Sequence, residues 1–333
     1  MNRDKAAADL APDRFAPEVQ RWWRRCRPSP VPALLVLLAV LAPLVAPPYQ
    51  LSLLLLAFMY IALACSWNLI GGYAGYFTFG HVAYFGVGAY AAALAITELG
   101  MHWLAAAGLA ALLAAGLGAV VGYPSLRIKG PAFVIITFAF SQALRITTHV
   151  ADTWTGGGRG LSLPPVQSLT GVYYAFAAAA FAAVAGTWWI DRSAFGRRLK
   201  AIRDDEFAAE SIGIDTQADK SKAFILSALL PGFCGGVYAF YLSYINPEEA
   251  FSHRLNVSMI VMVLLGGAGT VLGPVIGALL VFFVSELLWA QFPVLHQLAF
   301  GIALVALVLF LPDGVLGWLR RRRARRPGRD AGG

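Results

Sequence analysis

The stretch LSLLLLAFMYIALACSWNLI occupies residues 51–70 and contains no charged side chain. Twenty mostly apolar residues in a helix are long enough to cross the hydrocarbon core of a bilayer. A glycine-rich break, GGYAG at residues 71–75, follows directly, and a second apolar run begins beyond it. This alternation of apolar runs and short breaks predicts an all-α bundle of membrane-spanning helices.

The composition of the whole chain agrees with a membrane protein. Of its 333 residues, 59% are hydrophobic and 13% are charged, whereas soluble domains carry about a quarter charged residues. The formal net charge of +8 would suit a nucleic-acid-binding protein. The basic residues lie beside the apolar runs, however, where lipid headgroups and insertion energetics account for them. We therefore expect membrane lipid, and not nucleic acid, as a partner.

Ten segments qualify as candidate spans. They are residues 31–48, 51–70, 77–97, 103–123, 131–150, 171–190, 222–245, 255–270, 273–290 and 295–312. Two glycine joints interrupt this pattern, the first at residues 71–75 and the second at residues 266–274. Each joint is either a tight turn or unwound backbone that lines a cavity inside the membrane. The prediction is therefore a polytopic bundle of eight to ten spans.

The basic residues predict the orientation of the bundle. Twenty-three of the 26 Lys and Arg residues fall into four clusters, at residues 3–27, 127–129, 192–222 and 320–329. Basic loops remain in the cytoplasm, and an even number of spans places all four clusters and both termini there. The predicted organisation is a basic segment at 1–30, a transmembrane domain at 31–313 with a cytoplasmic loop at 191–221, and an Arg-rich tail at 314–333.

The sequence contains no recognisable enzyme site. Cys26, Cys65 and Cys234 are far apart and lack metal-ligand spacing, so neither a metal nor a cofactor is expected. GYFTFG at residues 75–80 has the glycine spacing of a phosphate-binding loop. It lacks the Lys and the Ser or Thr that such a loop needs. Any ATP hydrolysis therefore has to occur on another chain.

Arg145 and Glu286 are charged residues that lie inside candidate spans, near their outer ends. Arg145 can extend its guanidinium to the interface, and Glu286 can pair with a neighbouring helix. An ion-coupled secondary transporter would need acidic residues near the midplane, and the chain offers only Glu286 and the peripheral Glu98. A membrane-embedded enzyme would need clustered His, Asp or Cys. Both alternatives are disfavoured.

The most informative polar stretch is FGRRLKAIRDDEFAAESIG at residues 195–213. One helical stripe of it contains Leu199, Ile202, Ala209 and Ile212. Lys200 and Asp204 have the spacing of an ion pair, and Gly213 can end the helix in a left-handed cap. We predict one short cytoplasmic helix. It is either a solvated element of the loop or a surface that docks into a groove of another protein.

Several motifs resemble the branched-chain amino acid permease family of ABC importers. They are GYAGYFTFGHVAYFGVGAY at 72–90, LRIKG at 126–130, GRRLKAIRD at 196–204 and LLGGAGTVLGP at 264–274. Ala208 and Ala209, with Gly213 beyond them, resemble the Glu-Ala-Ala…Gly loop by which such permeases engage their ATPases. Phe207 stands at the position of its glutamate, with Glu206 one residue earlier. Gln142 stands where the family often has a glutamate.

The resemblance implies a multi-pass subunit of the bacterial plasma (inner) membrane. Its implied partners are a homologous second permease, two cytoplasmic ABC ATPase subunits and a periplasmic or extracellular solute-binding protein. The external loops are too short to hold a ligand-binding domain, which agrees with a separate binding protein. Branched-chain amino acids lead as substrates, and urea, short amides and aromatic acids are the alternatives.

The resemblance also selects the residues of two expected sites. Residues expected to couple the chain to the ATPases are Gly196, Arg197, Arg203, Glu206, Ala208, Ala209 and Gly213. Candidate polar contacts along the substrate pathway are Asn68, Thr78, Thr137 and Ser141. For each of these four, hydrogen bonding between helices is the alternative.

Overall fold

The structure, a computed structural model, describes residues 39–44, 46–166, 168–291 and 301 of the chain. The chain divides into two units, residues 1–46 and 47–333. In the first unit, residues 39–44 are helical. The expected spans at 31–48 and 295–312 therefore lie mostly outside the described residues, as do both terminal basic clusters.

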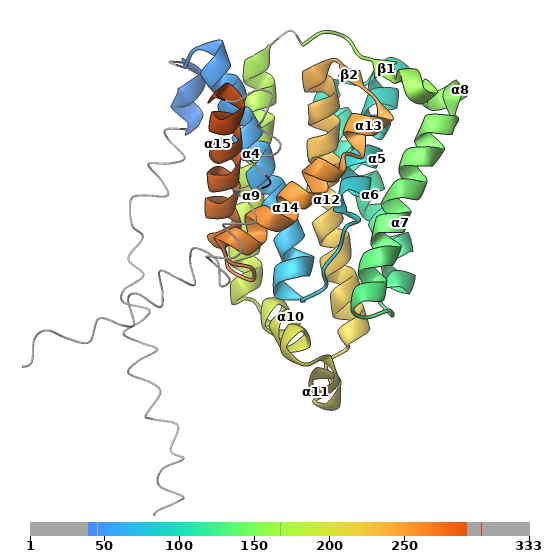
Figure 1. The fold of residues 1–333 in the computed structure, drawn as a ribbon, viewed down its shortest axis with the longest axis vertical. Helices are drawn as coiled ribbons and strands as arrows, with labels where there is room; N and C mark the ends of the chain where they lie inside the picture. The colour runs from blue at the N-terminus through green and yellow to red at the C-terminus, as the bar shows by residue number, and fades with distance from the viewer. Residues whose placement is uncertain (1–38, 45, 167, 292–300, 302–333) are drawn as a thin grey trace, which may run out of the picture. The chain divides into compact units, whose positions relative to one another are not determined.

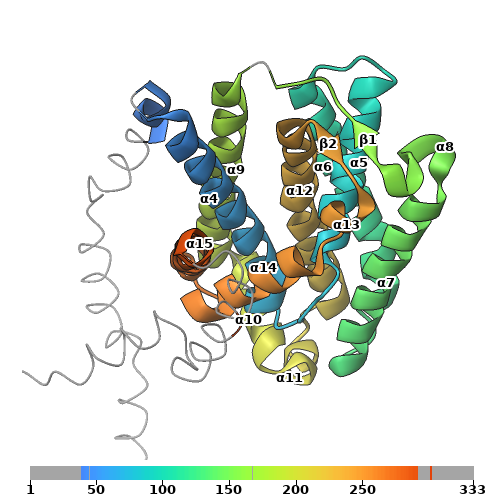
Figure 2. The ribbon, with the colours of Figure 1, turned by 45° about the horizontal axis from the view of Figure 1, so that its top comes forward.

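The second unit is helical almost throughout, which confirms the all-α prediction (Figures 1 and 2). Its first half contains α4 (Pro48–Asn68), the π-helix η2 (Leu69–Tyr73), α5 (His81–Thr97), α6 (Trp103–Ser125), α7 (Pro131–Val150), α8 (Asp152–Thr155) and η3 (Gly157–Arg159). Its second half contains α9 (Leu169–Arg192), α10 (Ala194–Asp204), α11 (Glu206–Ser211), α12 (Thr216–Leu242), α13 (Pro247–Ala250), α14 (His253–Gly266) and α15 (Gly273–Gln291). Two short strands, β1 (Leu161–Ser162) and β2 (Tyr244–Ile245), pair antiparallel.

Within the described residues, five helical segments are long and apolar enough to cross a membrane. They are α4 continued by η2, α6, α7, α9 and α12. The predictions for 77–97 and 255–270 need correction, because α5 begins only at His81 and α14 has only 14 residues. Fourteen helical residues extend about 21 Å, less than the hydrocarbon core of about 30 Å. Both segments therefore cross the bundle as short helices joined to non-helical backbone.

The two ends of the unit differ in charge. In Figure 1, α10, α11 and the loop between α6 and α7 lie at the lower end, whereas β1, β2 and α8 lie at the upper end. The lower end carries Arg127, Lys129 and the basic cluster at 192–222. The positive-inside rule predicts that this end faces the cytoplasm, so we call it the cytoplasmic end below and the upper end the outer end.

Glycines allow the central helix α12 to approach α5 closely. A Cβ on Gly88 of α5 would lie 2.2 Å from the carbonyl oxygen of Gly232, and a Cβ on Gly235 would lie 2.0 Å from that of Phe85. Small residues at such contacts are typical of helix packing in membranes, where backbones can then meet directly. The contact fixes α5, and with it the segment that precedes α5, against the middle of the bundle.

Candidate coupling site and pathway

The stretch predicted as one helix forms two helices, α10 and α11. Asp205 between them is extended, with φ −159° and ψ 109°, and its carboxylate accepts a 3.0 Å hydrogen bond from the Ala208 N–H. A side-chain oxygen in this position caps the start of a helix. The single-helix prediction is wrong because Asp205 caps a second helix instead of continuing the first.

The break changes the predicted apolar stripe. Leu199, Ile202 and Ala209 are buried as expected, but the side chain of Ile212 is 77% exposed. Phe207, which the stripe did not include, is 78% exposed. The short helix α11, which lies at the tip of the cytoplasmic end (Figure 1), and the residue that follows it therefore present two large apolar side chains to solvent.

The predicted ion pair between Lys200 and Asp204 does not form. Lys200 Nζ lies 2.6 Å from Asp191 Oδ1 at the end of α9, and Asp204 pairs with its neighbour Arg203 at 3.1 Å. Arg198 is also paired, 2.5 Å from the buried carboxylate of Asp219 on α12. Its hydrogen bond to Asp219 raises the pKa of Arg198 above the ordinary value for arginine. These contacts hold α10 to α9 and α12.

Two of the expected coupling residues are glycines that the backbone requires. A Cβ on Gly196 would lie 2.0 Å from the carbonyl oxygen of Ile190, so α10 can start this close to α9 only without a side chain. Gly213 has φ +88°, in the left-handed region as predicted, and its N–H bonds the Glu210 carbonyl at 2.9 Å. Arg197 is exposed and donates to the Arg192 carbonyl at 3.1 Å.

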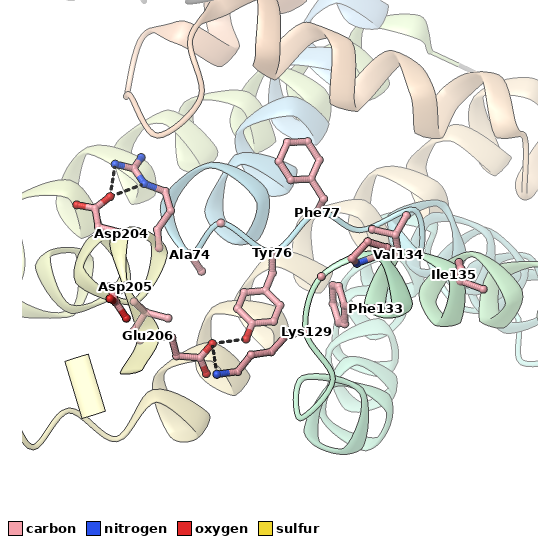
Figure 3. Close-up of a pocket in the computed structure, with 15 residues that line it drawn as sticks. Ala74, Tyr76, Phe77, Lys129, Phe133, Val134, Ile135, Asp204, Asp205 and Glu206 are labelled. Atoms are coloured by element: carbon pink, nitrogen blue, oxygen red, sulfur yellow. Dashed lines mark hydrogen bonds and ion pairs between the residues drawn. The ribbon is translucent and has the colours of Figure 1, made fainter. Parts of the chain in front are cut away.

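Glu206 is the centre of a charged cluster that joins three parts of the chain (Figure 3). Its carboxylate lies 2.5 Å from Lys220 Nζ of α12, 2.6 Å from the Tyr76 hydroxyl and 3.2 Å from Lys129 Nζ. Lys220 also donates to Tyr76 at 2.9 Å and to the Leu126 carbonyl at 3.1 Å. We call Glu206, Lys220, Lys129 and Tyr76 the inner cluster.

Lys220 and Glu206 of the inner cluster are shielded from water, whereas the side chain of Lys129 is 58% exposed. The side chains of Lys220 and Glu206 are 2% and 12% exposed. Burial by itself raises the pKa of the Glu206 carboxyl, but the hydrogen bonds from Lys220, Tyr76 and Lys129 outweigh it, so that its pKa lies below the ordinary value. Glu206 therefore carries a negative charge that is directed into the bundle, not toward the cytoplasm.

The backbone between η2 and α5 is unwound over residues 74–80, which we call the unwound segment. Its polar groups are bound by side chains of other helices, as unwound backbone in a membrane requires. Thr137 Oγ1 of α7 accepts from the Phe79 N–H at 3.2 Å, Trp67 donates to the Thr78 carbonyl at 3.0 Å, and Asn256 of α14 donates to the Phe79 carbonyl. In the first glycine joint, residues 71–73 belong to η2 and residues 74–75 begin the unwound segment, so unwound backbone is observed only in its second part.

The two glycine joints contact each other, and α10 contacts their junction. The amide of Asn68 accepts from the Gly269 N–H at 2.8 Å and donates to the Thr270 carbonyl at 3.0 Å. Arg203 of α10 donates to the Gly72 carbonyl at 3.2 Å. A single side chain of α10 therefore reaches the point where the two interrupted spans meet.

A cavity of about 770 Å³ lies beside the unwound segment at the cytoplasmic end (Figure 3). Its lining comes from residues 74–77 of the unwound segment, residues 129–135 at the start of α7, and residues 202–206 of α10 and α11. The apolar side of this lining includes Phe77, Phe133 and Ile135, and the polar side includes Tyr76, Lys129 and Glu206 of the inner cluster. The cavity thus brings the predicted coupling residues next to the backbone that interrupts a span.

The four predicted pathway residues are buried and hydrogen-bonded. Besides the bonds of Asn68 and Thr137 given above, Thr78 Oγ1 accepts from the Gly80 N–H at 3.0 Å and Ser141 donates to the Phe138 carbonyl at 2.7 Å. Thr78 lies in the unwound segment and Thr137 binds it, Asn68 binds the second glycine joint, and Ser141 bonds only within α7. Their role in transport stays a prediction. Within the described residues, no three His, Cys, Asp or Glu side chains gather as metal ligands would.

Sequence reasoning did not identify Tyr76, Lys129, Lys220 or Asn256. Lys129 and Lys220 belong to basic clusters that orientation alone already explained, and Tyr76 was one aromatic residue among many in its motif. Asn256 carried a usable signal, because it is an amide in the apolar run of α14, and polar residues within spans commonly bond to other helices.

Comparison with known proteins agrees with this architecture. A family model described as "Branched-chain amino acid transport system / permease component" matches residues 49–311. The chain is 28% identical to the high-affinity branched-chain amino acid transport system permease protein LivM of Escherichia coli (strain K12), covering 88% of this chain and 77% of LivM. It is 25% identical to LivH of Salmonella typhimurium, covering 78% of this chain and 91% of LivH.

A more distant similarity reaches permeases with other names. The chain is 27% identical to the ribose import permease protein RbsC of Haemophilus influenzae over 60% of its length and 65% of RbsC. No solved structure matches the chain. The motifs, the helical bundle and the match over residues 49–311 lead to one conclusion: this multi-pass membrane protein belongs to the branched-chain amino acid transport system permease family.

Proposed function

We propose that the chain is one of two permease subunits of an ATP-binding-cassette importer in a bacterial inner membrane. Together with a homologous permease it forms the pathway for branched-chain amino acids, which a solute-binding protein delivers and two cytoplasmic ATPase subunits drive inward. The names of LivM and LivH support the substrate and the pairing, because the chain aligns with both. ATP hydrolysis then belongs to the ATPase subunits.

The observation that carries the proposal is the exposed tip of α11. Phe207 and Ile212 are more than three quarters exposed at the cytoplasmic end, where water and not lipid surrounds them. Burying such a side chain contributes about 1.5–3 kcal/mol, and exposed apolar side chains of this kind mark protein interfaces. We assign the tip of α11 as the ATPase docking surface.

The seven predicted coupling residues divide between this surface and its support. Arg197, Ala208 and Gly213 are exposed and belong to the docking surface. Gly196, Ala209 and Glu206 face the bundle and hold α10 and α11 in place, and Arg203 reaches the glycine joints. Glu206 is therefore assigned to the support of the docking surface and not to a contact with the ATPase.

Motion at the docking surface has a direct route to the pathway. A push on α11 acts through Glu206 on Tyr76 of the unwound segment and through Arg203 on Gly72. ATP can shift the pathway between two states only if ATP-bound and ATP-free partners bind them with different free energies. The contacts of the inner cluster connect the docking surface to the pathway and can supply that difference in free energy. Thr78 and Thr137 hold the unwound segment in the wall of the pathway, and Asn68 holds the second glycine joint beside it.

The docking assignment is tested on the complete importer. The double variant Phe207→Ser with Ile212→Ser is expected to lose co-purification of the ATPase subunits, with affinity reduced at least about tenfold, and to lose ATP-driven leucine uptake in proteoliposomes. Ile128→Ser is the matched control, because Ile128 is also an exposed apolar residue at the cytoplasmic end but lies outside α10 and α11. Unchanged co-purification and uptake in the double variant would refute the assignment.

A further inference from the structure

A second polar network lies at the outer end, away from the inner cluster. Arg145 Nη1 of α7 lies 2.7 Å from Glu248 Oε2 and 2.9 Å from Glu248 Oε1 of α13. Arg145 Nε also donates to Gln142 Oε1 at 3.0 Å, and Gln142 Nε2 lies 2.7 Å from His253 Nε2 of α14. Three separate elements thus bring an arginine, a glutamate and the polar side chains of Gln142 and His253 together.

The surface of α7 connects this network with the cytoplasmic cavity. Ile135, Phe138, Gln142 and Arg145 follow at intervals of three and four residues, which places them on one face of the helix. Ile135 lines the cavity, and the ring centroids of Phe138 and His253 are 5.2 Å apart. One stripe of α7 therefore runs from an apolar cavity at the inner end to a charged group at the outer end.

The charged pair is open to water and easily separated. The side chains of Arg145 and Glu248 are 30% and 68% exposed, and an exposed ion pair contributes little net stability. Charged side chains are also too costly to face lipid without a partner. A ligand that carries both charges can therefore bind between Arg145 and Glu248, because it replaces their salt bridge with one salt bridge to each side chain.

We propose that Arg145 and Glu248, supported by Gln142 and His253, form an outer subsite for the zwitterionic head group of an α-amino acid. Arg145 receives the α-carboxylate through charge-assisted hydrogen bonds, and Glu248 receives the α-ammonium. The apolar side chain of the amino acid lies along Phe138 toward Ile135. The subsite rests on the proposed function and specifies its substrate class, since neutral solutes such as urea or amides offer no charges for it.

The test uses the complete importer in proteoliposomes, supplied with leucine-loaded solute-binding protein at increasing concentration. Arg145→Gln and Glu248→Gln are each expected to lower the maximal rate of leucine uptake at least about tenfold, with the half-saturating concentration of binding protein unchanged. Arg159→Gln is the matched control, because Arg159 is an exposed arginine at the same end, and it retains the wild-type rate. If only the half-saturating concentration of binding protein changed, the two residues would contact the binding protein and the proposed subsite would be wrong.

A charge-reversed variant separates a subsite from a structural latch. Arg145→Glu combined with Glu248→Arg restores an ion pair between α7 and α13 but exchanges the positions of the two charges. The subsite predicts that uptake stays low, because the amino acid would have to bind turned around and its side chain would leave the apolar stripe. Rescue to the wild-type rate would show a latch and overturn the proposal.

The outcome for the wild-type importer distinguishes the two proposals. If the wild type takes up leucine with ATP and the single variants match it, the subsite is wrong and the proposed function stands. If the wild type takes up no leucine, the proposed function itself fails and the subsite fails with it.

Discussion

The two ends of the bundle both join a carboxylate to basic side chains, but in different surroundings. At the inner end, Lys220 and Glu206 are 2% and 12% exposed and share further bonds with Tyr76 and Lys129. At the outer end, Arg145 and Glu248 are 30% and 68% exposed. Removing one partner of a buried pair leaves an unpaired charge and is costly, whereas an exposed pair exchanges readily with water. The inner cluster is thus a fixed joint, and the outer pair is an exchangeable contact.

The largest expected effect comes from breaking the inner cluster. Glu206→Ala leaves the Lys220 ammonium buried with only the Tyr76 hydroxyl and the Leu126 carbonyl, and should destabilise the protein by about 3 kcal/mol. The measurement is the midpoint of heat unfolding in detergent. Asp204→Ala is the control, because its carboxylate is 71% exposed and its loss should cost less than about 1 kcal/mol. Equal shifts for both variants would contradict a fixed inner joint.

A second comparison tests the close backbone contact that starts α10. Gly196→Ala places a Cβ 2.0 Å from the Ile190 carbonyl oxygen and should destabilise the protein by about 1–3 kcal/mol. Gly116→Ala in α6 meets nothing within 4 Å and should be neutral or stabilising by up to about 1 kcal/mol. Heat unfolding of both variants checks the contrast. A tolerated alanine at 196 would mean that α10 is not fixed to α9.

The pH dependence sharpens the assignment of charge to the inner cluster. The pKa of Glu206 is lower in the folded protein than its ordinary value of 4.5. The ionised carboxylate therefore contributes its full stabilisation of the folded protein above about pH 4.5, and this stabilisation is lost as the pH falls through the folded pKa. The difference in unfolding midpoint between wild type and Glu206→Gln should therefore be largest near neutral pH and shrink below pH 4.5. A difference that does not depend on pH would show that the charge of Glu206 does not stabilise the fold.

The smallest expected effect on stability lies at the outer end. Arg145→Gln should change the free energy of unfolding by less than about 1 kcal/mol, because the ion pair it removes is exposed. The same unfolding measurement checks it. A loss as large as that of Glu206→Ala would remove the distinction between a fixed inner joint and an exchangeable outer pair.

The sequence supports the class of fold but not the contacts that connect its parts. The uncharged run at 51–70 and the basic clusters were sufficient for a helical membrane protein, because length and charge act locally. The break at Asp205 was missed because the helical stripe over residues 195–213 is continuous in the sequence. In the structure, the Asp205 carboxylate caps a second helix and interrupts it. Lys220 and Tyr76 are 144 residues apart, and no local pattern predicts that they bind the same carboxylate.

The glycine joints show the same limit. Their composition indicated either turns or unwound backbone, and composition alone supports both equally. The decision depends on polar side chains of other helices, such as Thr137, which accepts from the Phe79 N–H, and Asn256, which donates to the Phe79 carbonyl. Likewise, the sequence predicted that Arg145 lies near the outer end of its helix, but no local pattern predicted that Glu248 of α13 binds it.

The central claim, that the inner cluster transmits motion from the ATPases to the pathway, is tested most directly by the number of leucine molecules taken up per ATP hydrolysed. The measurement compares Glu206→Gln with the wild type in proteoliposomes that contain the complete importer. The variant keeps Phe207 and Ile212, so the ATPase subunits should still bind and hydrolyse ATP, while uptake per ATP should fall about tenfold. An unchanged ratio of uptake to hydrolysis would contradict the claim.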